Sequence, residues 1–550
     1  MNRVLAILLA AILSPSVFAQ DETVNHRSEE FDKLLSAQFE PGGPGAVALV
    51  ARNDRVMYSK AFGMANLEHN VPMHVNAVFK IGSITKQFTA VAVLQLAEQG
   101  RLSLQDEITR FIPDYPTHGH TITVEHLLTH TSGIPNYSGL KEAAQRGPMD
   151  FSPAEIIDWF KNEPLRFPPG TKWEYSNSGY VLLGYVIEIV SGKTYGEYLE
   201  ENIFRPAQMR SSLYADDIRL VKHRADGYAK AEKGFVNVPH ISMSQPYAAG
   251  AILSTVEDLF QWNRALLSNT LITKDSRQRA WTPYVLADGT ETTYGYGWRF
   301  GYIQDSPSIW HGGWINGFIT MAMYLPKEDV FVAVFSNCED NSPEDVTAKL
   351  AAVAIGQPYE YDVIPTDSVS FRQYEGVYET ADGQFMMLIP AGNRLYSRLG
   401  WGPKVEMLAY QEDKYFLGDD VFHSISFHRD SAGNVKGFVS RNRKAIVEWQ
   451  KTDKPLPSPD GLALEEGILR SYVGEYRLAR DFTFTVTLEL PRLYVQATGQ
   501  EKLEMVAESE TRFFLKANDA QIEFVRGGSG PVTKAIVRQG GRVAEAIKIR

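Results

Sequence analysis

The pattern of apolar and polar positions predicts a mixture of strands and helices up to about residue 350. Two apolar runs, 46–52 and 56–62, flank Asn-Asp at 53–54, a pair typical of a tight turn, and together predict a β-hairpin. Farther along, apolar residues occupy nearly every face of 84–97, which predicts a helix buried on all sides.

Two further kinds of signal extend this mixed pattern. Capping-box sequences at 152–155 and 254–257 precede apolar periodic runs and predict two helix starts. The segments 308–326 and 330–336 are rich in aromatic and β-branched residues and predict adjacent strands of one sheet.

The last third of the chain contains an internal repeat with a constant offset of 98 residues. The sequence YEGVY at 374–378 recurs as YVGEY at 472–476, and RLY at 394–396 recurs at 492–494. In the second copy, residues 482–490 alternate between apolar and polar, as in a strand with one buried face. Each copy, roughly 90 residues of short strands and turns, therefore predicts a small closed antiparallel barrel.

The amino terminus has the layout of a cleavable signal peptide. Arg3 precedes an apolar run at 4–13, and small residues stand at the −3 and −1 positions of a cut after Ala19. The run is too short to span a bilayer, and the chain has no later apolar stretch of roughly 18 residues. We therefore expect residues 1–19 to be removed and the mature protein to be periplasmic or secreted, without stable membrane insertion; the alternative is a retained anchor.

Composition narrows the partners. The 550 residues are 44% hydrophobic and 22% charged, which is typical of a folded globular protein with a large core. The net charge of −11 argues against nucleic acid as a partner and leaves a small molecule or short peptide as the expected substrate. The single cysteine, Cys338, excludes an intrachain disulfide and is expected to be a buried thiol.

Ser83-Ile-Thr-Lys86 places a hydroxyl and an amine one helical turn apart. Such a serine becomes a nucleophile if burial lowers the pKa of the lysine toward neutrality. The start of the helix also offers unpaired backbone N–H groups to a developing negative charge. Taken alone this motif is weak, because a capping serine with a solvated lysine has the same spacing.

Two more motifs follow in order, Tyr175-Ser-Asn177 and His311-Gly-Gly313. The order Ser-x-x-Lys, Tyr-x-Asn, His-x-Gly resembles the serine penicillin-recognising enzymes, in the branch that contains class C β-lactamases, D,D-carboxypeptidases, D-aminopeptidases and related esterases. The supporting stretches are 122–135, 203–209, 248–259 and 294–298.

The resemblance implies an α+β fold. It predicts a β-lactamase-like catalytic domain at 20–360, an antiparallel sheet flanked by helices with a helical subdomain. Two small lipocalin-like barrels would follow at 366–452 and 462–550, separated by a proline-rich linker, an architecture similar to that of bacterial D-aminopeptidases.

The resemblance also assigns roles. Ser83 would be the acylated nucleophile, with Lys86 and Tyr175 sharing its proton; which of these two is the first base stays open. His311 would be the fourth catalytic residue. It replaces a lysine of true β-lactamases, and since a histidine is largely neutral at pH 7, efficient penicillin hydrolysis is not expected.

Three residues are expected to bind the substrate. Asn177 would orient the substrate amide or Lys86, and Gly313 and Trp314 would line the site. The backbone N–H groups of Ser83 and Trp314 would form the oxyanion hole.

Four histidines, at 118, 120, 126 and 130, suggest a metal site, but the pattern does not support one. A zinc-protease helix needs His-Glu-x-x-His, and Leu127 stands in place of the glutamate. No nucleotide-binding or dinucleotide-binding motif occurs either, so we expect neither a metal nor a cofactor.

The sequence thus predicts an exported serine hydrolase that acts through an acyl-enzyme on amides or peptides of the D-amino-acid or peptidoglycan type. A barrel loop is expected to shape the cleft, with Asp481 as a weak candidate to bind a substrate ammonium group. The alternatives are a carboxylesterase and a non-hydrolytic protein that binds peptidoglycan fragments. The sequence does not decide the oligomeric state, and a homo-oligomer is compatible with it.

Overall fold

The computed structural model describes residues 27–140, 147–216, 218–400, 402–456, 462–479, 482–515, 520–527, 530–539 and 542–550. The chain divides into two compact units, Met1–Tyr359 and Glu360–Arg550. The predicted signal peptide lies outside the described residues. Among those residues, none of the helices combines the length and the apolar character that a membrane span requires.

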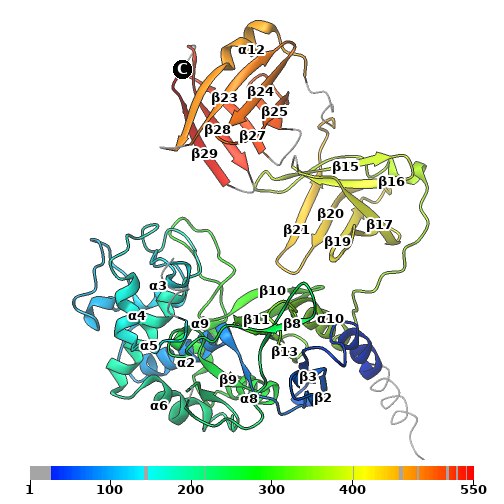
Figure 1. Cartoon of the computed structure of the whole chain (residues 1–550). Coiled ribbons are helices and arrows are strands. Elements are labelled where there is room, and N and C mark those ends of the chain that lie inside the picture. Colours follow the sequence, from blue (N-terminus) through cyan, green and yellow to red (C-terminus); the bar gives the residue numbers. More distant parts are fainter. Residues whose placement is uncertain are drawn as a thin grey trace, which may run out of the picture. The chain divides into compact units, whose positions relative to one another are not determined.

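The first unit is built on a six-stranded antiparallel sheet with the order β10-β11-β12-β13-β1-β2 (Figure 1). Its strands are β1 (Ala46–Arg52), β2 (Arg55–Phe62), β10 (Arg299–Ile303), β11 (Ser306–Ile315), β12 (Phe318–Leu325) and β13 (Val330–Ser336). Every residue of β13 is buried, so both faces of the sheet are covered there. Helices α8 (Val256–Leu267) and α10 (Glu344–Ala354) pack against the central strands.

The other helices of this unit gather beside the sheet (Figure 1). They include α2 (Thr85–Glu98), α3 (Val124–Leu128), α4 (Pro153–Phe160), α5 (Asn177–Ser191), α6 (Tyr195–Leu199), α7 (Tyr247–Gly250) and α9 (Lys274–Ala280). As its sequence predicts, α2 is buried on all sides from Thr85 to Leu96. A single 3₁₀ turn, η1 (Gly82–Ile84), precedes α2 and contacts β11, which places Ser83 between the helices and the sheet.

Two predicted elements are confirmed and one capping residue is corrected. The β1–β2 hairpin turns through Asn53 and Asp54, both with left-handed φ (49° and 62°), as a two-residue hairpin requires. Helix α4 starts with the predicted capping box at Ser152. Helix α8 is capped by Thr255 and not by Ser254, because the Ser254 hydroxyl hydrogen-bonds with Ser212 instead (2.8 Å).

The second unit contains two closed eight-stranded antiparallel barrels, as predicted (Figure 1). The first consists of β14 (Gly376–Glu379), β15 (Phe385–Ala391), β16 (Arg394–Leu399), β17 (Val405–Gln411), β18 (Lys414–Leu417), β19 (Asp420–Arg429), β20 (Val435–Arg441) and β21 (Ile446–Lys451). The second consists of β22 (Gly474–Ala479), β23 (Phe482–Glu489), β24 (Arg492–Ala497), β25 (Lys502–Ala507), β26 (Arg512–Leu515), β27 (Ala520–Arg526), β28 (Val532–Gln539) and β29 (Arg542–Lys548).

The repeat in the sequence is a repeat in structure. The Tyr378 hydroxyl donates to the Tyr374 carbonyl (2.8 Å), and 98 residues later the Tyr476 hydroxyl donates to the Tyr472 carbonyl (2.7 Å). Buried apolar and aromatic side chains form one core cluster in each barrel. The expected architecture, an α+β unit followed by two antiparallel barrels, is therefore confirmed.

Candidate active site

Ser83 lies where the turn before α2 touches strand β11. Gly82 has φ +50°, and a Cβ added there would lie 2.9 Å from the Trp314 nitrogen. Only glycine permits so close an approach of the two backbones. As a result the backbone of Ser83 comes next to that of Trp314, the pair expected to form an oxyanion hole.

A second glycine, Gly313 in β11, also permits the close approach of this strand to the turn before α2. A Cβ on Gly313 would lie 1.9 Å from the Ile81 carbonyl oxygen, which is impossible without moving the backbone. The Thr320 hydroxyl donates to the same carbonyl at 3.0 Å. The segment that leads into Ser83 is therefore fixed against β11 and β12.

Lys86 is fully buried behind Ser83. Its Nζ lies 3.0 Å from the Ser83 Oγ, 2.8 Å from the Asn177 Oδ1 and 2.8 Å from the Ala249 carbonyl oxygen. Burial, and next the charge of Arg299, holds the pKa of Lys86 well below its usual value. A neutral amine in this position can donate its two N–H groups to Asn177 and Ala249, which leaves its lone pair for the Ser83 hydroxyl.

Tyr175 lies in the loop before α5 and lines the same pocket as Ser83. The Lys86 Nζ lies 4.8 Å from the centre of the Tyr175 ring. Burial raises the pKa of Tyr175 to about 12, although the nearby Ser83 hydroxyl and the charge of Arg299 act in the opposite direction. The phenol is therefore protonated at neutral pH.

His311 lies in the same pocket as a neutral ring. Its Nδ1–H donates to the Gly312 carbonyl (2.6 Å), so its Nε2 accepts from the Tyr294 hydroxyl (3.0 Å). Burial, and then the charges of Arg299 and Lys86, holds its pKa well below the usual value. His311 therefore provides no positive charge for a substrate carboxylate.

Arg299 provides that charge, and sequence reasoning missed it. Its guanidinium lies 5.5–5.8 Å from the centres of four aromatic rings, those of Trp173, Tyr175, Tyr294 and Trp310. No hydrogen-bond acceptor or carboxylate contacts the guanidinium within the described part of the chain. A guanidinium whose five N–H donors contact no acceptor in the described chain is suited to bind a planar anion such as a carboxylate.

These side chains border one pocket of about 480 Å³. Its lining includes Ser83, Tyr175, Arg299, Trp310, His311, Gly313 and Trp314. Lys86 is joined to it through Ser83, and Asn177 is joined to it through Lys86. The structure thus brings all seven residues singled out in the sequence into one site.

Comparison with known proteins places this geometry in a family. The protein-family model described as Beta-lactamase matches residues 29–357, which is more than half of the chain. The chain belongs to the β-lactamase family of serine hydrolases. A second model, a domain of unknown function, matches residues 462–546 and so spans the second barrel.

Individual relatives support the assignment. Penicillin-binding protein 4* of Bacillus subtilis is 30% identical over 446 residues, which cover 73% of this chain and 97% of the relative. An octameric penicillin-binding protein homologue from Pyrococcus abyssi has 25% identity and a TM-score of 0.52, over 79% of this chain and all of that one. A D-stereospecific amidohydrolase from Streptomyces has 26% identity and a TM-score of 0.53, over 59% and 98%.

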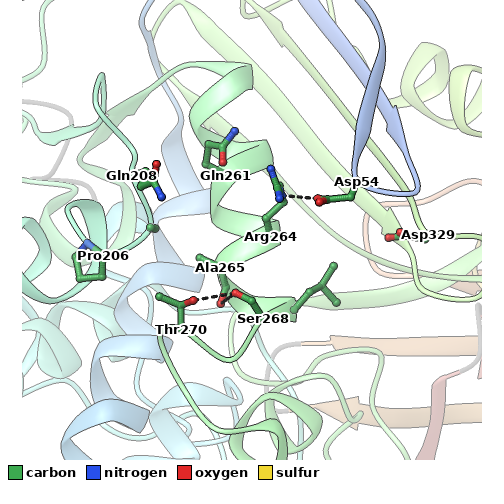
Figure 2. Close-up of a pocket in the computed structure, with 11 residues that line it drawn as sticks. Asp54, Pro206, Gln208, Gln261, Arg264, Ala265, Ser268, Thr270 and Asp329 are labelled. Atoms are coloured by element: carbon green, nitrogen blue, oxygen red, sulfur yellow. Dashed lines mark hydrogen bonds and ion pairs between the residues drawn. The ribbon is translucent and has the colours of Figure 1, made fainter.

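A second pocket in this β-lactamase-family unit also contains an arginine, but that arginine is paired with a carboxylate. It measures about 420 Å³ and lies beside α8 (Figure 2). Its arginine, Arg264, forms an ion pair with Asp54, and Ser268 hydrogen-bonds with Thr270 (2.8 Å). Arg264 is thus paired with a carboxylate, whereas Arg299 forms no ion pair within the described residues.

Two of the four histidines considered for a metal, His126 and His130, have local structural partners. His126 accepts from the Thr123 N–H through Nδ1 (3.2 Å) within a capping box, and His130 accepts from the Ser176 N–H through Nδ1 (3.2 Å). Within the described ranges no group of three or more His, Cys, Asp or Glu side chains is placed to hold a metal ion. Asp481 lies outside the described residues.

A sequence signal for Arg299 did exist. It directly follows the stretch 294–298, which supports the resemblance to this family, and it precedes His311 by twelve positions. The stretch that supports the resemblance ends at Trp298, so it does not include the arginine. Only the pairing of Arg299 with Trp310 across β10 and β11 brings it to the pocket.

Proposed function

We propose that this chain is an exported serine hydrolase that cleaves amide bonds of short D-amino-acid or peptidoglycan-type peptides through an acyl-enzyme on Ser83. The observation that carries the proposal is the environment of the Lys86 amine. Its two other contacts, to Asn177 and Ala249, leave its lone pair directed at the Ser83 hydroxyl 3.0 Å away.

The proposed first step uses the neutral Lys86 as base. Lys86 takes the proton of Ser83 as the Oγ attacks the substrate carbonyl, and the N–H groups of Ser83 and Trp314 stabilise the oxyanion, each worth about 3–4 kcal/mol in comparable sites. Tyr175 then gives its proton to the leaving nitrogen and recovers one from Lys86. Water then attacks the acyl-enzyme, and the same proton transfers run in reverse: a proton of the water passes through Tyr175 and Lys86 to the Ser83 Oγ as the acid is released.

The charge of Arg299 supports a substrate with a free carboxylate. Among the residues that line the pocket it is the one cation, and the one carboxylate there, Glu344, lies at the exposed start of α10. A carboxylate on the substrate favours a D,D-peptidase-like reaction over aminopeptidase action, which needs an acidic group for the substrate ammonium. The D-stereospecific amidohydrolase and penicillin-binding relatives support D-residues.

The test compares the wild type with Ser83→Ala. We expect a fluorophosphonate to label the wild type and not the variant. We then expect turnover of N-acetyl-D-alanyl-D-alanine to exceed that of its C-terminal amide, and D-amino-acid p-nitroanilides to be poorer substrates than the acetylated dipeptide.

Other outcomes lead to the alternatives. Turnover of short p-nitrophenyl esters with every amide inert would make the protein a carboxylesterase. Absence of both a Ser83 adduct and turnover would favour a binding protein for peptidoglycan fragments.

Export and assembly are part of the proposal. The layout of residues 1–19 supports cleavage after Ala19, so sequencing of the exported protein should begin at Gln20. The octameric homologue supports a homo-oligomer, which light scattering of the purified protein tests.

A further inference from the structure

Among the described residues, no strand pairs with the last part of β11 on the side of β10, beside Ser83. Strand β10 pairs with β11 only as far as the register Arg299↔Trp310, whereas β12 continues to Ile315 on the other side. Because side chains alternate along a strand, Trp310, Gly312 and Trp314 lie on one face of this edge, opposite to His311.

The two indoles on this face are unusually accessible. Trp314 is 61% exposed, and Trp310 is only partly buried. Both line the pocket that contains Ser83, together with the apolar side chains of Ile319 and Met321. An indole left accessible beside a reactive serine offers a large apolar surface to a ligand.

Gly312 between the two indoles is not required by the backbone. A Cβ there would meet the Thr320 carbonyl oxygen at 3.4 Å and the Met321 sulfur at 3.6 Å, which are ordinary contacts. The next residue, Gly313, tolerates no side chain at all. At Gly312 the effect of the glycine is therefore to leave open the space between Trp310 and Trp314.

We propose that Trp310, Gly312 and Trp314 form a subsite for an apolar side chain of the substrate. The inference rests on the proposed function and adds the substrate class: the residue whose carboxylate Arg299 binds has an aromatic or branched aliphatic side chain. The geometry supports this pairing, because the Arg299 guanidinium lies 5.6 Å from the centre of the Trp310 ring. A carboxylate on Arg299 therefore brings the adjacent side chain to the indoles.

Protection of Ser83 tests the subsite without depending on which bond is cleaved. Labelling of Ser83 by a fluorophosphonate is followed in the presence of N-acetyl-D-phenylalanine or N-acetyl-D-alanine. We expect the phenylalanine compound to protect at a concentration at least about tenfold lower, in line with the selectivity of hydrophobic pockets.

Two variants probe the space between the indoles. Gly312→Val fills it, and Trp314→Ala removes one wall while keeping the backbone N–H. In both variants we expect the ratio of protective concentrations to fall to about threefold or less. Gly312→Ala should give an intermediate ratio, and thermal melting checks that each variant is folded.

These experiments distinguish a failure of the proposed function from a failure of the proposed subsite. A wild-type protein whose Ser83 is not labelled overturns the proposed function. Normal labelling with equal protection by the two compounds overturns the subsite alone, as does a tenfold ratio that persists in both Gly312→Val and Trp314→Ala. If Gly312→Val does not fold, Trp314→Ala alone decides.

Discussion

His130 holds the backbone on both sides of Tyr175. Its carbonyl oxygen accepts from the Glu174 N–H (3.0 Å), and its Nδ1 accepts from the Ser176 N–H (3.2 Å). The rings of His130 and Tyr175 pack with centroids 4.3 Å apart. His130 itself has a left-handed φ of 59°, which histidine and asparagine tolerate better than most residues. The position of the phenol beside Ser83 thus depends on a residue outside the three motifs.

We predict that His130→Phe slows labelling of Ser83 by about 10- to 100-fold, because a small displacement of a catalytic group is costly. The ring remains, but the Ser176 N–H loses its acceptor. His130→Asn keeps an acceptor and tolerates the left-handed backbone, so it should recover much of the rate.

A double-mutant cycle separates positioning from general damage to the fold. If His130 acts through Tyr175, His130→Phe should cost little in a Tyr175→Phe background. An equal loss in both backgrounds would show that the histidine is merely structural.

Arg299→Gln should weaken binding of substrates that have a free carboxylate. We expect its kcat/KM for N-acetyl-D-alanyl-D-alanine to fall by about 10- to 100-fold, mainly through KM, because a charge-assisted hydrogen bond to the carboxylate is lost. The C-terminal amide of the same peptide should be affected much less. Arg299→Lys, which keeps the charge but not the planar fork, is the matched control.

The pH dependence follows from two shifted pKa values. In the proposed mechanism the neutral form of Lys86 is the base, and its pKa is lowered. The Ser83 labelling rate should therefore rise with pH through that pKa and then level off. The pKa of Tyr175 is about 12, so no decrease is expected below about pH 10. Arg299→Gln removes a positive charge that lowers the pKa of Lys86, so the rise should move to higher pH. A rise that stays in place would contradict this coupling.

Two adjacent glycines should respond differently to alanine. Gly313→Ala places a Cβ 1.9 Å from the Ile81 carbonyl oxygen, so we expect a loss of several °C in melting temperature and severe loss of Ser83 labelling. Gly312→Ala makes only contacts of 3.4 Å or more and should melt close to the wild type. Similar melting of the two variants would argue against the close packing of β11 on the turn before Ser83.

The two barrels should depend equally on their repeated tyrosines. Tyr378→Phe and Tyr476→Phe each leave a buried carbonyl, that of Tyr374 or Tyr472, without its donor. We expect each to lower the free energy of unfolding of its barrel by about 1–3 kcal/mol, measured by denaturant titration. Tyr494→Phe, whose hydroxyl makes no hydrogen bond within the described residues, is the control and should have little effect.

Local and repeated patterns allowed much of the fold to be predicted. The Asn53-Asp54 turn needs only residues that accept positive φ, and the 98-residue repeat predicts two copies of whatever one copy forms. The motifs around Ser83, Tyr175 and His311 were recognised because each is a short contiguous sequence whose chemistry depends on neighbours a few positions apart.

The groups that contact the residues of these motifs lie far from them in the sequence. The Ala249 carbonyl that receives a Lys86 N–H is a backbone group, and a sequence pattern does not show where a carbonyl points. Arg299 acquires its surroundings from rings spread between Trp173 and Trp310. In the sequence His130 is one of four closely spaced histidines. Its role depends on the fold, which brings residues 174–176 next to it.

The sequence by itself therefore determined the family of the fold, the repeated barrels and the residues proposed to react, because helical spacing, alternation and turn chemistry act over a few residues. Only the tertiary structure decided the charge of the pocket, the lowering of the pKa values of Lys86 and His311, and which of two adjacent glycines leaves no room for a side chain. Burial and close backbone approach fix these properties, and both arise when segments far apart in the chain pack together.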